Sequence, residues 1–147
     1  KMQLLQDKRI VVMGLLSADS IAWAIGQRAQ AEGAKVIYTI QNERYLKTIL
    51  LRSFRKQGLN VDDYKIYGCD VEIEEDIQLL FKKTDKIDGV VYSIAYAARE
   101  CLEGSLWDAS REQILKSLNI SAVGLAYVAR AAQERLQKKQ LNRRFDF

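Results

Sequence analysis

Short apolar runs alternate with longer segments of helical periodicity along most of this sequence, and that alternation limits the folds open to it. The apolar runs are rich in Ile, Val and Tyr and predict strands at residues 9–13, 35–40, 65–69 and 89–94. Strands separated by helices are typical of successive βαβ units, in which helices cover both faces of a parallel sheet. The sequence therefore predicts an α/β fold with buried parallel strands.

Apolar residues also recur three or four positions apart between these strands, as they do on one face of a helix. The residues expected to cover the sheet form three stripes, namely Ile21, Ile25 and Ala29, then Leu46, Ile49, Leu50 and Phe54, then Ile73, Ile77, Leu80 and Phe81. After the last strand, Ser110 and Gln113 have the spacing of a capping box and predict the start of a long helix. Its expected buried stripe runs nearly to Lys138 and comprises Ile114, Leu118, Ser121, Leu125, Ala129, Ala132 and Leu136.

Right-handed crossovers between these elements predict a Rossmann-type doubly wound sheet with strand order 3-2-1-4 and helices on both faces. The order reverses between strands 1 and 4, and ligands of such sheets bind at that switch point, beyond the carboxyl ends of the strands. Gly14, Asp70 and Ser93 follow three of the predicted strands and are expected at that edge. With 147 residues and no sign of a boundary, we expect residues 1–147 to form one dinucleotide-binding domain.

The turn after the first strand carries the main signal for a ligand. Gly14 begins a loop that ends at Ser20, an expected helix N-cap, and an apolar-periodic helix starts at Ile21. Glycine permits a tight turn, and the backbone N–H groups at a helix start can bind a pyrophosphate. The loop lacks the second and third glycines of the G-x-G-x-x-G fingerprint, so an ordinary turn remains the alternative.

Composition excludes several other classes of function. His is absent, which rules out His-dependent catalysis, and Cys69 and Cys101 lack paired-ligand spacing, so we expect reduced thiols and no metal site. The net charge of +4 is modest, and the basic cluster at 138–144 has no interleaved aromatic residues, so no nucleic acid is expected. No apolar run is long enough for a membrane span or signal peptide, so we expect a cytoplasmic protein without membrane contact.

Five segments in order carry a resemblance to a known family. They are Gly14-x5-Ser20-Ile21-Ala22, residues 37–43 (IYTIQNE), Cys69-Asp70-Val71, residues 88–95 (DGVVYSIA) and Asn119-Ile120-Ser121. From about Leu5 to Leu136 the sequence resembles the short-chain dehydrogenase/reductase superfamily. Within it, the closest likeness is to the N-terminal half of the NADH-dependent enoyl-acyl-carrier-protein reductases.

The resemblance implies roles for the matched positions. The pyrophosphate would be lined by Gly14, Ser20 and Ile21, and the adenosine ribose would be contacted by Gln41. The adenine would be held by Asp70 and Val71. The nicotinamide ribose would be flanked by Ser93, Ile94, Ala95 and Ile120. Tyr96 would be an aromatic beside the active site, and Asn119 a structural or proton-relay residue. Local alternatives stay open, because Asp70 is also a good helix cap, Ser93 and Asn119 can satisfy nearby backbone groups, and Tyr96 can be core.

The implied cofactor is NADH, while Arg44 leaves NADPH open because a guanidinium suits a 2′-phosphate. Many relatives have Lys or Arg before the serine of the first motif, whereas this chain has Ala18 and Asp19, whose charge should repel a pyrophosphate.

The family's catalytic Tyr-x6-Lys pair follows the next strand. Residues 137–147 do not have the pattern of that strand, and Tyr127 has no Lys at the required interval. We therefore expect this chain to lack the catalytic segment, to be inactive alone and to need a cover for the free edge of strand 4.

Three functions follow as hypotheses. The first is an enoyl-acyl-carrier-protein reductase that uses NADH in fatty-acid synthesis. The second is a catalytically inactive nucleotide-binding or structural module, and the third is a general short-chain alcohol or ketone reductase. Relatives form tetramers through the helices after strand 4. We expect a homo-oligomer here, since small residues in that region would admit a second helix. Packing in the core of the same chain explains these residues equally well, namely Ala122, Gly124, Ala126 and Ala129.

Overall fold

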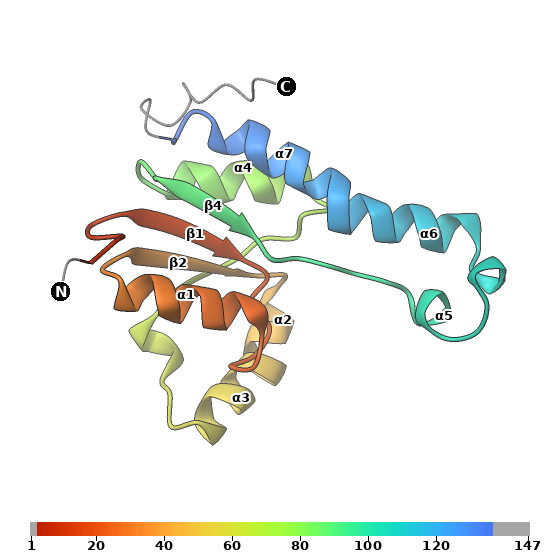
Figure 1. Ribbon diagram of the computed structural model, residues 1–147, viewed down its shortest axis with the longest axis horizontal. Coiled ribbons are helices and arrows are strands. Elements are labelled where there is room, and N and C mark those ends of the chain that lie inside the picture. The colour runs from red at the N-terminus through yellow and green to blue at the C-terminus, as the bar shows by residue number, and fades with distance from the viewer. Residues whose placement is uncertain (1–2, 137–147) are drawn as a thin grey trace.

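The computed structural model describes residues 3–136 and contains a four-stranded parallel sheet (Figure 1). Its strands are β1 (Arg9–Met13), β2 (Lys35–Ile40), β3 (Lys65–Gly68) and β4 (Gly89–Tyr92). They pair in the order β3-β2-β1-β4, which confirms the predicted Rossmann-type topology. β3 and β4 end slightly before their predicted bounds. Both are edge strands of the described sheet and are partly exposed, so the expectation of burial on both faces holds only for β1 and β2.

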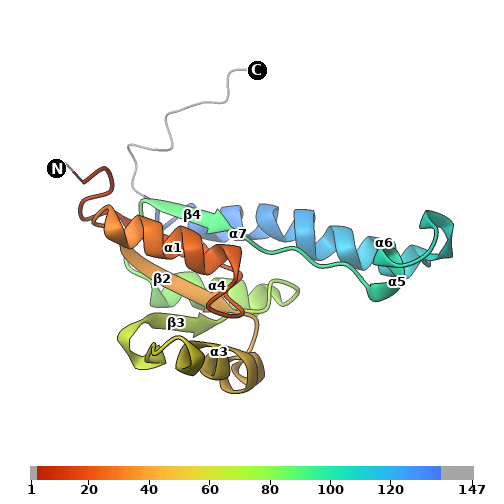
Figure 2. The same cartoon turned by 60° about the horizontal axis from the view of Figure 1, so that its bottom comes forward.

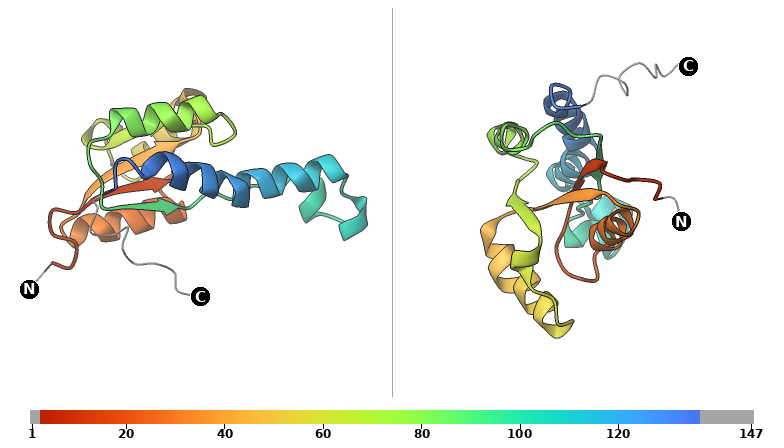
Figure 3. Two further views of the ribbon diagram at one scale, coloured as in Figure 1. Left: turned by 90° about the horizontal axis from the view of Figure 1, so that it is seen from above. Right: turned by 90° about the vertical axis from the view of Figure 1, so that its left-hand side faces the viewer.

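Helices cover both faces of this sheet (Figure 3). One face is covered by α1 (Ile21–Ala31) and by a helix made of α2 (Glu43–Tyr45), a π-helical turn (Leu46–Leu50) and α3 (Leu51–Lys56). The other is covered by α4 (Glu74–Lys83) and by the end of a long helix made of α6 (Arg111–Leu118), a π-helical turn (Asn119–Val123) and α7 (Gly124–Ala132). Short helical turns lie at Val61–Asp63, α5 (Arg99–Leu102) and Leu106–Asp108.

The alternation of side chains along the strands produces two separate cores. Val12 and Tyr38 point toward α1 and α3, where Trp23 and Phe54 pack with ring centroids 4.6 Å apart. Val11 and Met13 point the other way, toward α4 and α7. The sheet is therefore anchored on both sides, and its carboxyl edge is held in place.

The predicted stripe of α1 was wrong in part. Ile21 is 72 % exposed, and the buried residues of α1 are Ala22, Trp23, Gly26 and Ala29. The ring of Tyr38 occupies the space above Gly26 and leaves no room there for a larger residue, so the face of α1 that lies on the sheet carries Gly26 together with Ala22, Trp23 and Ala29. In the other two stripes Ile49 and Ile73 are exposed, while Leu50, Phe54, Ile77, Leu80 and Phe81 are buried as predicted.

The long helix begins at the predicted capping box, in which Ser110 and Gln113 bond each other's backbone amides at 3.2 and 2.7 Å. Its buried face differs from the predicted one. The buried residues are Ile120, Gly124, Val128 and Ala132, whereas the predicted Ile114, Leu118, Leu125 and Ala129 are exposed. Gly124 packs against the hydroxyl of Tyr92, so it cannot be part of a contact with another helix as expected from the sequence.

α5 and α6 extend away from the sheet as an arm beyond the carboxyl ends of the strands (Figures 1 and 2). At the other end of the long helix, Leu136 pairs with Ile87 in an isolated parallel bridge just before β4. The predictions for residues 137–147, including the basic cluster and the missing strand, lie outside the described residues. Between residues 3 and 136, no helix is long and apolar enough to span a bilayer.

The contact between Gly26 and Tyr38 yields a stability prediction. A Cβ at position 26 would lie 2.2 Å from the Tyr38 hydroxyl oxygen, and Tyr38 is fully buried. Gly26→Ala should therefore lower the free energy of unfolding by about 1 to 2 kcal/mol, although alanine favours a helix by about 1 kcal/mol. Urea denaturation measures the change. Ala24→Gly, at an exposed position of α1, is the control for helix propensity, and a more stable Gly26→Ala would contradict the packing argument.

Candidate functional site

A cleft of about 430 Å³ opens at the carboxyl edge of the sheet, where the sequence analysis expects a ligand. The predicted residues that line it are Gly14, Gln41, Asp70, Val71, Ser93, Ile94, Ala95, Tyr96 and Ile120. They come from the ends of all the strands and from the long helix. Ser20, Ile21, Arg44 and Asn119 are not on its wall.

The Gly14 turn brings three strand ends together. Gly14 has a φ of +101°, and a Cβ there would lie 2.1 Å from the carbonyl oxygen of Ser93, so only glycine fits. The amides of Gly14 and Leu15 donate to the carbonyl of Thr39 at 3.3 and 2.9 Å. The floor of the cleft is therefore backbone from β1, β2 and β4, which a flat ligand can approach closely.

Ser20 occupies the N-cap position of α1 as predicted, yet its side chain does not cap the helix. Its hydroxyl donates to the carbonyl of Ser17 and accepts the amides of Leu16 and Ser17 at 3.4 and 3.3 Å. This closes the loop and leaves the first turn of α1 without a side-chain cap. Backbone N–H groups at an uncapped helix start suit an anion.

Asp19 was expected to repel such an anion. Its carboxylate instead accepts a hydrogen bond of 3.1 Å from Nε2 of Gln57, at the end of α3, and Asp19 does not line the cleft. The structure therefore directs this charge toward α3.

Gln41 and Asp70 lie side by side, with Nε2 of Gln41 donating to a carboxylate oxygen of Asp70 at 3.1 Å. The other oxygen of Asp70 accepts the amide of Glu72 at 2.9 Å, while α4 begins at Glu74 with Ile73 as its N-cap. Asp70 thus closes a turn ahead of α4 and does not cap that helix. The pair presents an amide and a carboxylate on one wall of the cleft, both able to bond hydroxyl groups.

The loop after β4 is tied to the π-helical turn of the long helix. The Ser121 hydroxyl accepts the amide of Tyr96 at 3.0 Å and donates to its carbonyl at 3.1 Å. In the same turn the Tyr92 hydroxyl donates to the carbonyl of Ile120. A π-helical turn displaces backbone groups from regular pairing, which is why such turns are frequent at functional sites. Here it holds Ile120 and Tyr96 on the wall of the cleft.

Tyr96 is 40 % exposed, so it is not a core residue. Asn119 is exposed and lines a different hollow, between the long helix and Glu72, so the structure does not bring it to the cleft. Arg44 is exposed on α2.

The cleft wall also contains residues that the sequence analysis did not identify, namely Leu15, Leu16, Thr39, Tyr45, Cys69, Glu72 and Lys116. Thr39 lies within the second predicted strand and Leu15 two residues beyond the end of the first, so both are close to predicted strand ends. Lys116 precedes Ile120 by one helical turn, so the predicted helix gave the signal for it. Tyr45 had no such signal, because its position depends on the π-helical turn that follows it.

Two weakly acidic groups lie behind the cleft. Burial raises the pKa of the Cys69 thiol to about 12, and the carboxylates of Asp76 and Asp70 add to the effect. Burial likewise raises the pKa of Tyr92 to about 12. Both groups are therefore neutral at physiological pH. In the described part of the chain, no group of His, Cys, Asp and Glu could hold a metal ion.

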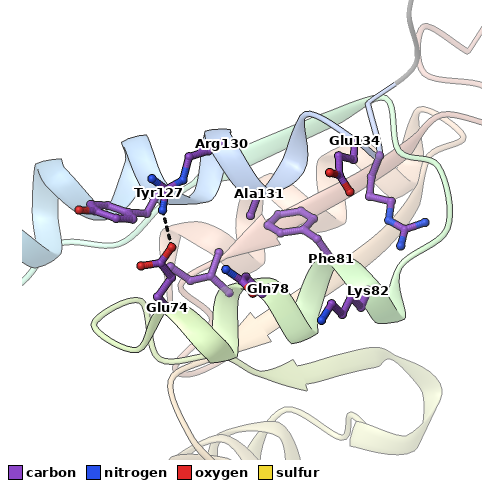
Figure 4. Close-up of a pocket in the computed structure, with 10 residues that line it drawn as sticks. Glu74, Gln78, Phe81, Lys82, Tyr127, Arg130, Ala131 and Glu134 are labelled. Carbon is purple, nitrogen blue, oxygen red and sulfur yellow. Dashed lines mark hydrogen bonds and ion pairs between the residues drawn. The ribbon is translucent and has the colours of Figure 1, made fainter.

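A second hollow, of about 330 Å³, lies between α4 and α7 (Figure 4). Arg130 projects over it, forms an ion pair with Glu74 and lies 4.8 Å from the ring centroid of Tyr127. Phe81 and Ala131 pack below. Because Arg130 is already neutralised, this hollow has the character of a groove between packed helices, and we assign it no chemistry.

The Ser121 contact can be tested on the structure alone. Ser121→Ala removes both bonds to Tyr96, so the Tyr96 amide should exchange its hydrogen about fivefold faster, for a loss of about 1 kcal/mol. Hydrogen exchange followed by NMR measures the rate. Ser117→Ala is the matched control, since the Ser117 hydroxyl bonds only the carbonyl of Gln113 on its own helix. An unchanged Tyr96 rate in Ser121→Ala would refute the contact.

Comparison with known proteins identifies the family. The sequence profile of the enoyl-(acyl carrier protein) reductase family matches residues 14–142. The NADH-dependent enoyl-[acyl-carrier-protein] reductase of Bacillus cereus is 36% identical over 137 residues, which cover 90% of this chain and 52% of that protein. The NADPH-dependent reductase of Staphylococcus aureus is 34% identical over 134 residues, or 88% and 51% of the two chains.

Solved structures agree. The B. cereus reductase, crystallised with NADP+ and indole naphthyridinone, matches with a TM-score of 0.78 and 36% identity over 92% of this chain and 53% of that one. The Anaplasma phagocytophilum reductase, crystallised with NAD, matches with a TM-score of 0.77 and 26% identity over 92% and 52%. The chain spans about half the length of the curated relatives it matches. It belongs to the enoyl-(acyl carrier protein) reductase family.

Proposed function

We propose that this chain holds NADH in the cleft at the carboxyl edge of its sheet and supplies the cofactor-binding half of an enoyl-thioester reductase. The observation that carries the proposal is that most of the matched residues, though not Ser20, Ile21 or Asn119, line one cleft at the switch point where the sheet reverses its strand order. Relatives of this chain are named as reductases dependent on NADH or NADPH.

In this proposal the backbone of the Gly14 turn and the uncapped start of α1, at Ser20 and Ile21, face the pyrophosphate. Gln41 and Asp70 bond ribose hydroxyls and adenine, and Val71 and Ile120 supply apolar walls. The loop containing Ser93, Ile94 and Ala95 flanks the nicotinamide ribose, with Tyr96 beside the reacting end.

NADH is favoured over NADPH by the charge at the ribose end. The Asp70 carboxylate, bonded to Gln41, would repel a 2′-phosphate. Arg44 is not on the cleft wall, and its neighbour Lys47 is paired with Glu43 at 2.8 Å. The Arg44 guanidinium therefore offsets little of the repulsion between the Asp70 carboxylate and a 2′-phosphate.

The chemistry belongs to the whole protein. NADH supplies a hydride to the β-carbon of a 2-enoyl thioester carried by an acyl carrier protein, in fatty-acid synthesis. The 147 residues contain no Tyr-x6-Lys pair, so here the proposal covers binding and orientation of the cofactor. The general alcohol or ketone reductase hypothesis depended on Asn119, which lies outside the cleft. The free thiols of Cys69 and Cys101 support a reducing, cytoplasmic setting.

We also propose that the protein is a homo-oligomer that pairs through the outer face of the long helix. Exposed residues three or four positions apart form this face, namely Leu115, Leu118, Ala122, Leu125 and Ala129. Leu115 and Leu118 are 57 % and 54 % exposed, and an apolar stripe of this kind on a soluble protein marks an interface.

Cofactor titration tests the first proposal. The chain should bind NADH saturably with a dissociation constant below about 1 mM and bind NADPH about tenfold more weakly, because of the Asp70 charge. Calorimetry measures both constants. Asp70→Asn should reduce the difference between the two dissociation constants by removing the charge, while Glu75→Gln, at an exposed position on α4, is the control for net charge. Absence of saturable binding by either dinucleotide would refute the function, and tighter binding of NADPH would refute the preference.

Analytical ultracentrifugation tests the proposed homo-oligomer. The wild-type chain should sediment as a dimer or larger, and Leu118→Glu should shift it toward monomer, because a charge in an apolar interface is desolvated without a partner. The matched control is Leu79→Glu on α4, where Leu79 is 49 % exposed outside the long helix. A monomeric wild-type chain at high micromolar concentration would contradict this interface.

A further inference from the structure

One basic residue lines the cleft, and neither the family resemblance nor the relatives assign it a role. Among the described residues on the cleft wall, Lys116 is the single Lys or Arg, whereas Asp70 and Glu72 are both acidic. Lys116 lies on α6, one turn before Ile120. Its charge is therefore the one positive side chain that a ligand in the cleft would meet.

The position of its ammonium is not the one expected for a solvent-exposed helix. Glu112 precedes Lys116 by four residues, in the order that favours an ion pair along a helix. The equivalent pair of Glu43 and Lys47 forms at 2.8 Å. Lys116 forms no ion pair with the described residues, and its Nζ lies 5.6 Å from the ring centroid of Tyr96.

The Lys116 ammonium is held near the cleft by its contact with the ring of Tyr96. The Tyr96 backbone is held on both sides by the Ser121 hydroxyl, so the ring belongs to the wall of the cleft. A contact with a ring face attracts the ammonium but uses none of its donors on a carboxylate, which leaves them able to bond an anion.

The ligand of this cleft needs a positive partner. A dinucleotide carries two phosphate charges, and the carrier arm of an acyl thioester carries another. The turn that approaches the pyrophosphate has Ala18 and Asp19 in place of a cation. Backbone N–H groups can compensate part of the negative charge of these phosphates, but they carry only partial positive charges.

We propose that Lys116 is a phosphate-binding residue of the cleft, whose ammonium donates to a phosphate oxygen of the bound ligand. The proposal rests on the proposed function, because it assumes a cofactor or carrier-arm phosphate in the cleft. Glu72 lines both the cleft and the hollow beyond Lys116, so it is the carboxylate that competes for the same ammonium.

Calorimetric titration of the full chain tests this with two pairs of ligands that differ by their phosphates: ADP with adenosine, and 4′-phosphopantetheine with pantetheine. Lys116→Gln should raise the dissociation constant of a phosphate-bearing ligand about fivefold and leave that of the matched phosphate-free ligand unchanged. Lys116→Arg should stay within about twofold of wild type, and Glu72→Gln should bind more tightly. Lys56→Gln, at an exposed lysine on α3, is the control for net charge.

The pair in which the effect occurs identifies the source, cofactor or carrier arm. If Lys116→Gln binds both phosphate ligands as tightly as wild type, the inference is overturned, while normal binding of NADH leaves the proposed function in place. An equal loss in Lys116→Arg and Lys116→Gln also overturns it, because charge would not be the cause. Failure of the wild-type chain to bind NADH overturns the proposed function, and the inference with it.

Discussion

The approach of the Gly14 backbone to the carbonyl of Ser93 brings the ends of β1 and β4 together, and the rest of the cleft depends on it. Because the amides of Gly14 and Leu15 also bond Thr39, the end of β2 is joined to the same point. None of these contacts uses the side chain of a cleft residue. The floor is therefore fixed by backbone geometry, while residues at the rim can differ between relatives without moving it.

The walls depend on two hydroxyl-bearing rings that point to opposite faces of the sheet. Tyr38 on β2 packs against Gly26 of α1, and Tyr92 on β4 packs against Gly124 of α7. Each glycine lets its helix lie close to the sheet, and each ring fills the space that a larger helix residue would have taken. The bond from Tyr92 to Ile120 then connects this packing directly to the cleft. Core and site are thus built from the same contacts.

Sequence patterns were sufficient for the fold because strand and helix periodicity are local properties. The strands, their order and the Ser110 capping box were all predicted correctly. The buried faces of α1 and the long helix were not, because apolar spacing identifies large residues. The structure buries Ala22, Gly26 and Gly124, since tyrosine rings on the sheet provide the volume. That choice depends on residues far away in the chain.

In the cleft, too, the residues fixed by local sequence were predictable and those fixed by distant contacts were not. Residues directly after a strand were predictable, since the carboxyl edge of a parallel sheet collects them. Tyr45, Lys116 and the exclusion of Asn119 depend instead on helix rotation. The turn Asn119–Val123 is π-helical and so holds about one residue more than a regular turn, which rotates α6 against α7 by about 100°. Deleting one residue there would restore a regular helix, yet it would swing the whole arm around its axis. The cleft would lose its basic wall and the outer leucines would lose their common face, so one backbone irregularity fixes both surfaces of the long helix.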